Sequence, residues 1–321
     1  MKIETDAQAL VIHAPAKVNL YLRVCGKRPD GYHEIETLMC PIAWTDTVRI
    51  APAPHSRIDF HLVSPAPGPS DNPFNRGDGT GVKSVPRGAD NLVVRAAELV
   101  RELTGVTQGC EIHLHKRIPP MAGLGGGSSD AAATVVGCMA LWNIWDRSLA
   151  TEICTRLGSD VPFFLGDRHH ISWAWATGRG EKVDVLHSVP RLHFNVTIPP
   201  LGCATAEVYA ALQGTSSSDD AGKIFDACEN GQYHKIGAAL RNDLQFAASK
   251  INPWIRRQLD LLKQSGVRYC QMTGSGSSCF GLIDDDQQRV RLRELAAQHE
   301  LDILDVPAWQ ADSVEKQLQR V

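Results

Sequence analysis

Apolar and polar residues alternate along the chain from Val11 to Val24. Alternation with a period of two is typical of a β-strand that has one face in the core and the other in solvent. The pattern therefore predicts a half-buried strand. Its apolar face carries Val18, Leu20, Leu22 and Val24, and its polar face carries Lys17, Asn19, Tyr21 and Arg23.

The rest of the chain mixes strand and helix patterns. Residues 44–50 and 57–63 predict two strands that pair in an antiparallel hairpin or meander. Residues 64–89 are dense in proline and glycine and predict a mobile surface loop. This mixed order favours an α+β fold over a doubly wound parallel sheet. Further helices are expected at 91–103, capped by Asp90 or Asn91, and at 128–141, 149–157, 206–212, 233–240, 253–265 and 287–299, with further strands at 110–115, 171–176, 192–198, 278–283 and 302–305.

Length and charge narrow the class of protein. The 321 residues are enough for about two domains. The chain holds 33 basic and 36 acidic residues, a formal net charge of -3, and no basic block. Because nucleic-acid binding usually needs a basic patch, we expect a small-molecule substrate and no nucleic acid as partner. No oligomeric state follows from these patterns.

Cysteine spacing and hydropathy indicate the compartment. The nine cysteines form no CxxC pair and are spaced irregularly, which argues against a disulfide framework or a zinc site. The longest apolar run, Ala131 to Trp142, is shorter than the roughly 20 residues of a membrane span. The first ten residues carry acids where a signal peptide would be basic. We therefore expect a cytoplasmic protein without membrane contact.

The stretch "IPPMAGLGGGSSDAAATVV" (118–136) places a glycine-rich loop directly before a predicted helix. It is not a P-loop, because no lysine follows the glycines. It is not a dinucleotide fingerprint either, because Ser128 stands at the third glycine position. Bare amides that lead into a helix N-terminus can bind an anion, and the hydroxyls of Ser128 and Ser129 can bind phosphate or a metal on it. The alternative interpretation is a flexible glycine linker.

Four stretches together resemble the galactokinase, homoserine kinase, mevalonate kinase and phosphomevalonate kinase (GHMP) superfamily. The loop "PPMAGLGGGSSDAA" (119–132) is similar to its phosphate loop. "APAKVNLYLRVCGKRPDGYHEIETLM" (14–39) resembles its first motif and "QMTGSGSSCFG" (271–281) its third. "PDGYHEI" within the first motif and "LGSDVPFFLG" (157–166) narrow the resemblance to the 4-diphosphocytidyl-2-C-methyl-D-erythritol kinase family.

This resemblance implies a two-domain α+β GHMP-kinase fold. It has an N-terminal, ribosomal-protein-S5-like nucleotide domain over residues 1–186 and a C-terminal, ferredoxin-like domain over residues 187–321. The implied reaction is ATP-dependent phosphorylation of the 2-hydroxyl of 4-diphosphocytidyl-2-C-methyl-D-erythritol, a step of the non-mevalonate isoprenoid route. Another GHMP kinase of small alcohols (homoserine or mevalonate type) and a non-catalytic ligand sensor on the same fold are the alternatives. Loss of the catalytic lysine and aspartate would indicate the sensor, and both residues are present.

The resemblance also assigns roles to residues. Lys17 and Asp160 are the catalytic pair, and the alternative interpretation of Asp160 is a cap for a helix that has Pro162 in its first turn. Mg²⁺ is expected to arrive with ATP, held partly by phosphate oxygens, so no dedicated protein metal site is expected. Asn91, Leu92 and Lys116 are implied to lie around the adenine of ATP. The rest of ATP is implied to bind Pro119, Pro120, Met121, Ala122, Gly123, Leu124, Gly125, Gly126, Gly127, Ser128 and Ser129, and the substrate Asn19, Tyr32, His33, Thr205 and Tyr209.

Three other features of the sequence bear on the phosphate loop, on metal binding and on surface charge. Met121 stands where the family usually has a glycine, and this is expected to restrict one amide of the loop. His113 and His115 share a strand face, but no third metal ligand is evident, which favours a solvated edge. The acidic run at 284–286 predicts a solvated turn.

Overall fold

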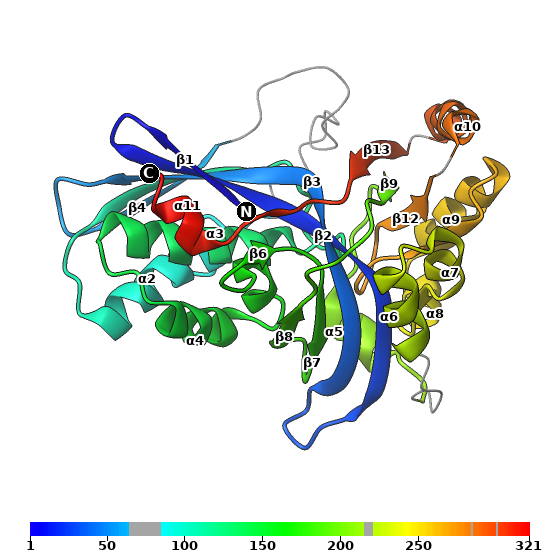
Figure 1. The fold of residues 1–321 in the computed structure, drawn as a ribbon, viewed down its shortest axis with the longest axis horizontal. Helices are drawn as coiled ribbons and strands as arrows, with labels where there is room; N and C mark the ends of the chain where they lie inside the picture. Colours follow the sequence, from blue (N-terminus) through cyan, green and yellow to red (C-terminus); the bar gives the residue numbers. More distant parts are fainter. Residues whose placement is uncertain (64–84, 215–220, 284, 300) are drawn as a thin grey trace.

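The computed structural model describes residues 1–63, 85–214, 221–283, 285–299 and 301–321. Most of the predicted 64–89 loop, and Asp284 of the predicted acidic turn, lie outside these ranges. The described residues form two lobes that share one pair of long strands, β2 (Ala9–Lys27) and β3 (His33–Pro52) (Figure 1). The prediction of an α+β fold is confirmed.

The first sheet shows that the predicted 44–50/57–63 hairpin is wrong. Its strands follow the order β1 (Lys2–Asp6), β2, β3, β5 (Cys110–His115) and β4 (Ile58–Val63). β5 lies between β3 and β4, antiparallel to β3 and parallel to β4. A parallel pair needs a crossover connection, and α2 (Leu92–Thr104) lies in the connection from β4 to β5.

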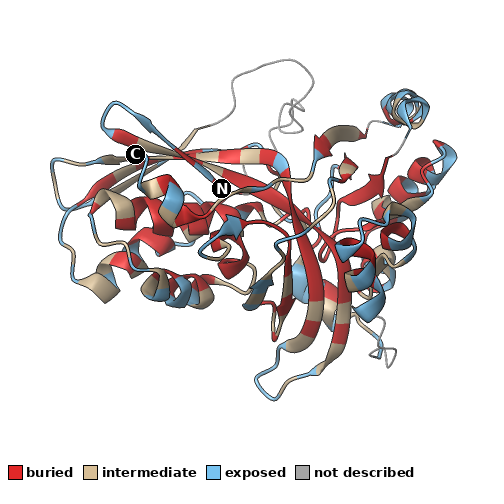
Figure 2. Cartoon of the chain, viewed as in Figure 1, coloured by how far each residue is buried: buried red, intermediate tan, exposed pale blue. Residues whose placement is uncertain are grey.

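β2 is buried on both faces, so the prediction of a half-buried strand is wrong. Lys17 and Asn19 are each 3% exposed, and Tyr21 is completely buried. The second lobe covers this polar face: Thr273 Oγ1 donates to Asn19 Oδ1 at 3.3 Å, and the Arg241 guanidinium lies 5.7 Å from the ring centroid of Tyr21. β10 (Arg241–Asn242) also pairs in parallel with Tyr21 and Leu22 at the edge of β2. Figure 2 shows the resulting run of buried residues along both long strands. A single strand's alternation cannot reveal that another part of the chain packs on its polar face.

Helix α3 (Gly126–Leu141) is the centre of the first lobe. It packs against β2, β3, α2 and α4 (Arg147–Leu157), and its buried residues lie all around it. A helix that is apolar all round is buried rather than lying on a surface. It begins at Gly126, two residues before the predicted start. The glycine loop is therefore fixed to the most buried helix of the lobe.

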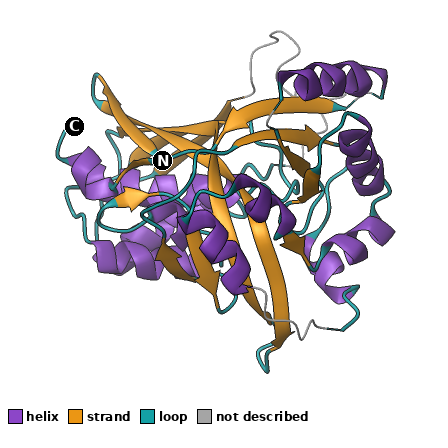
Figure 3. Ribbon diagram, turned by 45° about the vertical axis from the view of Figure 1, so that its right-hand side comes forward, coloured by secondary structure: helices purple, strands orange, loops and turns teal. Residues whose placement is uncertain are grey.

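The second lobe is an antiparallel sheet with helices beside it (Figure 3). Its strand order is β11 (Tyr269–Met272), β12 (Cys279–Leu282), β9 (His193–Ile198) and β13 (Asp302–Pro307). Its helices are α5 (Thr205–Ala210), α6 (Ala221–Glu229), α7 (Tyr233–Ala238), α8 (Gln245–Ile251), α9 (Trp254–Gln264) and α10 (Asp286–Gln298).

The end of the chain returns to the first lobe. β14 (Ala311–Asp312) pairs with β6 (His170–Ile171), and α11 (Val314–Leu318) follows. Gln317 in α11 accepts a hydrogen bond from the Ile3 amide at 2.8 Å. The predicted division at residue 186 stays a prediction, but the last strand and helix pack with the first lobe. The remaining elements are the 3₁₀ helix η2 (Pro162–Leu165), β7 (Ala174–Thr177) and β8 (Lys182–Val185).

All the helices predicted from periodicity exist within a few residues of their predicted bounds. The predicted strands at 110–115, 192–198, 278–283 and 302–305 also exist, and the one at 171–176 is split into β6 and β7. Sequence periodicity did not predict the short strands β1, β8, β10, β11 and β14 or the helices α6, α8 and α11. None of the helices in the described ranges has the length and apolar character of a membrane span.

Gly137 in α3 provides a test of this packing. A Cβ atom at this position would lie 2.5 Å from Ile50 Cδ1 and 2.9 Å from Ile12 Cδ1. We expect Gly137→Val to lower the free energy of unfolding by about 1 to 3 kcal/mol, because overpacking a filled core strains it. Gly222→Ala in α6 is the matched control, since a Cβ atom there would have nothing within 4 Å, and helix propensity predicts equal or higher stability. Denaturant unfolding curves that coincide for Gly137→Val and wild type would contradict the account.

Candidate active site

Lys17 and Asp160 meet at the junction of the two lobes. Lys17 Nζ lies 3.4 Å from Asp160 Oδ2 and donates a hydrogen bond to Asn19 Oδ1 at 2.7 Å. The side-chain amide of Asn19 in turn donates to Thr37 Oγ1 at 2.8 Å. The Lys17 side chain is 4% exposed and that of Asp160 is 34% exposed. The ammonium is thus held in a fixed position beside a carboxylate that solvent or a ligand can reach.

Asp160 does not cap a helix. η2 begins at Pro162, its N-cap is Val161, and no side chain forms a cap hydrogen bond. The alternative interpretation of Asp160 as an N-cap is therefore wrong. Its carboxylate is left to pair with Lys17.

The glycine loop packs closely against the Lys17 strand and the loop that begins at Thr273. Gly123 and Gly125 have left-handed backbones, with φ of 74° and 70°. A Cβ atom at Gly123 would lie 2.1 Å from the Thr273 carbonyl oxygen, and one at Gly125 would lie 3.0 Å from Lys17 Cγ. The Lys17 amide donates to the Leu124 carbonyl at 2.9 Å. These glycines are required by conformation and by space, which excludes the interpretation of the loop as a plain linker.

The N-terminus of α3 offers free polar groups to a ligand. Its N-cap is Gly125, without a side-chain cap, and its first turn holds no acidic residue. Ser129 Oγ is buried and has no hydrogen-bond partner among the described residues. The exposed amides of a helix N-terminus attract anions. Loop residues Pro119, Pro120, Ala122, Leu124 and Ser128 precede or enter this turn, as expected from the sequence.

Met121 adopts the left-handed conformation expected of the usual glycine. Its φ is 55°, and its side chain is exposed. Its carbonyl accepts a hydrogen bond from the Cys203 amide at 2.9 Å. Met121 thus has a left-handed backbone conformation that favours glycine. For a residue with a Cβ atom this conformation costs about 1 to 2 kcal/mol.

Lys116 is held in a buried ion network that the sequence did not reveal. Its ammonium pairs with Asp46 and, at 2.7 Å, with Asp130 of α3. Burial lowers the pKa of Lys116, but Asp130 and Asp46 outweigh it and raise this pKa above its ordinary value. Asp46 also accepts from the Ile118 amide at 2.9 Å, so the network fixes the strand end to the start of α3. The expected contact of Lys116 with adenine remains a prediction. In the structure its ammonium is paired with Asp46 and Asp130.

The predicted adenine residues lie beside the loop. Asn91 caps α2: its Oδ1 accepts from the Val93 amide at 2.9 Å. Leu92 Cδ1 would lie 3.7 Å from a Cβ atom at Gly127, in ordinary contact distance. The structure therefore brings Leu92 next to the phosphate loop.

The predicted substrate residues come from both lobes. The rings of His33 and Tyr209 stack, with centroids 4.9 Å apart and planes at 28°. Tyr32 is 54% exposed, and the Arg179 guanidinium lies 4.7 Å from its ring centroid. Burial, and then the Asp160 carboxylate, raise the pKa of Tyr209, while burial and then Lys27 lower the pKa of His33.

The loop from Thr273 to Ser278 contributes contacts to the site that were not predicted. Thr273 Oγ1 accepts from the backbone amide of Asn19 at 3.1 Å, and Ser275 shares a hydrogen bond with Thr205 at 2.8 Å. The Ser278 amide donates to the Ala122 carbonyl at 3.1 Å. The glycine and serine content of the third motif was the available signal, but only the fold shows which of its residues face the site.

Two further possible metal ligands lie near His113 and were not evident from the sequence, whereas the solvated edge expected there stays a prediction. Glu111 Oε1 lies 2.8 Å from His113 Nε2, and His61 of β4 lies opposite His113. These three residues place possible ligand atoms within 4.8 Å of one another. The parallel pairing of β4 with β5 brings His61 next to His113. The predicted hairpin paired β4 with β3 instead, so His61 was not expected beside His113. His115 is not a member of this group.

Comparison with known proteins agrees with this geometry. Residues 91–167 match the family model for the N-terminal domain of GHMP kinases, and residues 224–300 match the model for their C-terminal domain. The 4-diphosphocytidyl-2-C-methyl-D-erythritol kinase of Pelotomaculum thermopropionicum is 37% identical over 289 residues, covering 89% of this chain and 92% of that protein. The corresponding kinase of Bacillus cytotoxicus is 35% identical over 88% of this chain and 91% of its own.

Solved structures of two kinases share the fold of this chain. A crystal structure of 4-(cytidine 5'-diphospho)-2C-methyl-D-erythritol kinase has 32% identity and a TM-score of 0.71, over 93% of this chain and 98% of that chain. A homoserine kinase from Cytophaga hutchinsonii, at 17% identity and a TM-score of 0.69, covers 97% of this chain and 99% of its own and shares the fold. With this identity over nearly its whole length, the chain belongs to the 4-diphosphocytidyl-2-C-methyl-D-erythritol kinase family of GHMP kinases.

Proposed function

We propose that this chain transfers the γ-phosphate of ATP to the 2-hydroxyl of 4-diphosphocytidyl-2-C-methyl-D-erythritol, a step in isoprenoid precursor synthesis. The observation that supports this most is the Lys17 and Asp160 pair, 3.4 Å apart and next to a glycine loop that opens onto a helix N-terminus. Relatives that share more than a third of the sequence carry this kinase name. A ligand sensor on the same fold would not need to keep the pair.

Phosphoryl transfer needs alignment and charge neutralisation more than covalent help from the protein. Asp160 is accessible enough to orient the acceptor hydroxyl and to accept its proton. Because a loose phosphoryl-transfer transition state needs alignment most, orientation of the hydroxyl is the larger role of Asp160. Lys17, fixed by Asn19, stabilises negative charge on the transferred group. The amides of the glycine loop and of the first turn of α3 hold the phosphates of ATP.

The residues present fit a magnesium ion that arrives with ATP. Mg²⁺ prefers oxygen ligands and usually keeps several waters and phosphate oxygens. The Asp160 carboxylate is partly exposed, and Ser129 Oγ is buried without a partner among the described residues. Asp160, Ser128 and Ser129 would hold the ion, which would neutralise phosphate charge when bound.

We expect the cytosine ring of the substrate to lie between Tyr32 and Tyr209, with His33 at its polar edge. In the structure His33 itself stacks on Tyr209, so the base has to displace the imidazole from that ring. Base-aromatic stacking contributes about 1 to 3 kcal/mol but tolerates any base. Preference for cytidine must therefore come from hydrogen bonds to the ring edge.

Lys17→Met and Asp160→Asn should each lower kcat by about 10²- to 10⁴-fold, because charge stabilisation and positioned proton transfer are each worth that much. Circular dichroism and steady-state kinetics are the measurements. Lys182→Met, at an exposed lysine of another strand, is the control and should keep the wild-type rate. A folded Lys17 or Asp160 variant with more than about a tenth of the wild-type kcat, far above that expected range, would refute its catalytic role.

Gly125→Val should weaken ATP binding much more than Ser128→Ala. The valine side chain would meet Lys17 and Phe164 at about 3.0 Å and would be strained at positive φ. Gly127→Ala is the matched control, since its Cβ would have only an ordinary contact at 3.7 Å. Isothermal titration with ATP measures the three affinities, and an unchanged affinity in Gly125→Val would argue against a phosphate loop.

Tyr209→Ala should raise the KM for the diphosphocytidyl substrate several-fold and leave ATP affinity unchanged. Tyr209→Phe keeps the ring and should behave like wild type. His33→Ala should narrow the preference for the cytidine substrate over its uridine analogue. A normal KM in Tyr209→Ala, or equal use of both analogues by the wild type, would contradict stacking and edge recognition by these residues.

A further inference from the structure

The segment that follows η2 carries a second cluster of chemistry-bearing side chains, which shares no residue with the candidate active site. Asp167 and His170 lie in this segment, and His187 follows β8. Their possible ligand atoms all lie within 4.8 Å of one another. We propose that Asp167, His170 and His187 bind a divalent transition metal of the zinc class.

Asp167 is already oriented as a metal ligand. Its Oδ1 accepts hydrogen bonds from the amides of His169 and His170, both at 2.7 Å. Its Oδ2 lies 3.3 Å from His187 Nε2. Oδ1 therefore fixes the orientation of the Asp167 side chain, and Oδ2 faces His187.

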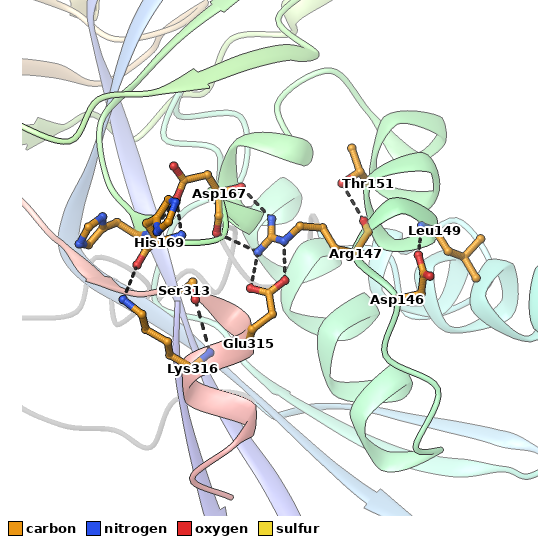
Figure 4. A network of polar contacts seen from close by, with 11 residues as sticks. Asp146, Arg147, Leu149, Thr151, Asp167, His169, Ser313, Glu315 and Lys316 are labelled. Atoms are coloured by element: carbon orange, nitrogen blue, oxygen red, sulfur yellow. Dashed lines mark hydrogen bonds and ion pairs between the residues drawn. The ribbon is translucent and has the colours of Figure 1, made fainter.

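Hydrogen bonds from Arg147 and Lys316 fix the backbone of this loop (Figure 4). Arg147 of α4 donates to the carbonyl oxygens of Gly166 and Asp167 at 3.0 Å and 2.9 Å. Its guanidinium also pairs with both carboxylate oxygens of Glu315 in α11. Lys316 Nζ donates to the His169 carbonyl at 3.3 Å. These bonds fix the backbone of the loop that carries Asp167 and His170.

The spacing of the ligands suits a small ion. Zinc bonds of about 2.0 to 2.2 Å in a tetrahedron place neighbouring ligand atoms about 3.3 to 3.6 Å apart. His187 lies 3.3 Å from Asp167 Oδ2 through Nε2 and 3.5 Å from His170 Nδ1 through Nδ1. A metal takes only one nitrogen of the ring, and the 55% exposed His187 side chain is free to turn toward it. Water fills the fourth position.

The cluster of His61, Glu111 and His113 is the weaker candidate. Its two imidazoles stack, with centroids 4.7 Å apart and planes at 28°. Ring nitrogens bind a metal in the plane of the ring, so stacked rings direct their nitrogens alongside one another instead of toward one ion. The rings of His170 and His187 are inclined at 67°, which lets their nitrogens converge.

The test is isothermal titration of the full-length chain with Zn²⁺ alone, repeated with excess Mg²⁺. Wild type should bind Zn²⁺ saturably at micromolar concentration, and Mg²⁺ should not compete, because imidazole ligands favour zinc. Replacing a supporting residue already costs about 10- to 100-fold in metal affinity, so His187→Ala, His170→Ala and Asp167→Asn should each lose at least about 100-fold at this site. Asn at position 167 can still accept the two amide bonds, which keeps the loop folded.

His13→Ala is the matched control. His13 Nε2 lies 3.4 Å from Glu4 Oε2, a pair of nearly the same spacing that belongs to neither three-ligand group of the described residues. This variant should bind Zn²⁺ as wild type does. Visible absorption of the Co²⁺-loaded chain should show a tetrahedral band that His187→Ala lacks. No saturable Zn²⁺ binding by wild type, or equal binding by wild type and His187→Ala, would overturn the proposal.

Discussion

The buried charge of Lys17 constrains much of this structure. An ammonium removed from water is costly unless it is paired and hydrogen-bonded. Its partners come from separate parts of the chain: Asn19 from the same strand and Asp160 from the segment after α4. The Lys17 amide also binds the Leu124 carbonyl of the glycine loop. The groups that satisfy one buried cation are therefore the groups that the proposed reaction requires.

The second lobe makes this burial possible. It covers the polar face of β2 and provides Thr273, whose hydroxyl accepts from the backbone amide of Asn19. The loop that follows Thr273 approaches Gly123 so closely that no side chain fits between them. The two lobes thus meet at the glycine loop, and a change in their packing would move the phosphate site and Lys17 together. This explains why motifs from three distant stretches are needed for one site.

The sequence predicted elements better than it predicted contacts. Periodicity located α2 and β5 because each has a regular apolar pattern, and the apolar run after the glycine loop located α3. It failed on the polar face of β2 and on the partner of β4, because both depend on what packs beside a strand. The motifs pointed to Lys17, Asp160 and the glycines, and the structure brings these together. Asp46 and Asp130 were missed because a buried carboxylate looks like a surface one until its cation is located. Met121 shows another limit: the sequence predicts that it restricts one amide of the loop, and only the structure shows that its backbone is left-handed.

The most direct test of the proposed function is a comparison of substrates for the wild-type chain. Turnover of ATP with 4-diphosphocytidyl-2-C-methyl-D-erythritol, homoserine and mevalonate would be measured under the same conditions, with the phosphorylated position identified by phosphorus and carbon NMR. We expect efficient turnover of the diphosphocytidyl substrate alone, with the new phosphate on its 2-hydroxyl. Comparable or faster turnover of homoserine or mevalonate, or no turnover of the diphosphocytidyl substrate, would contradict the proposed function.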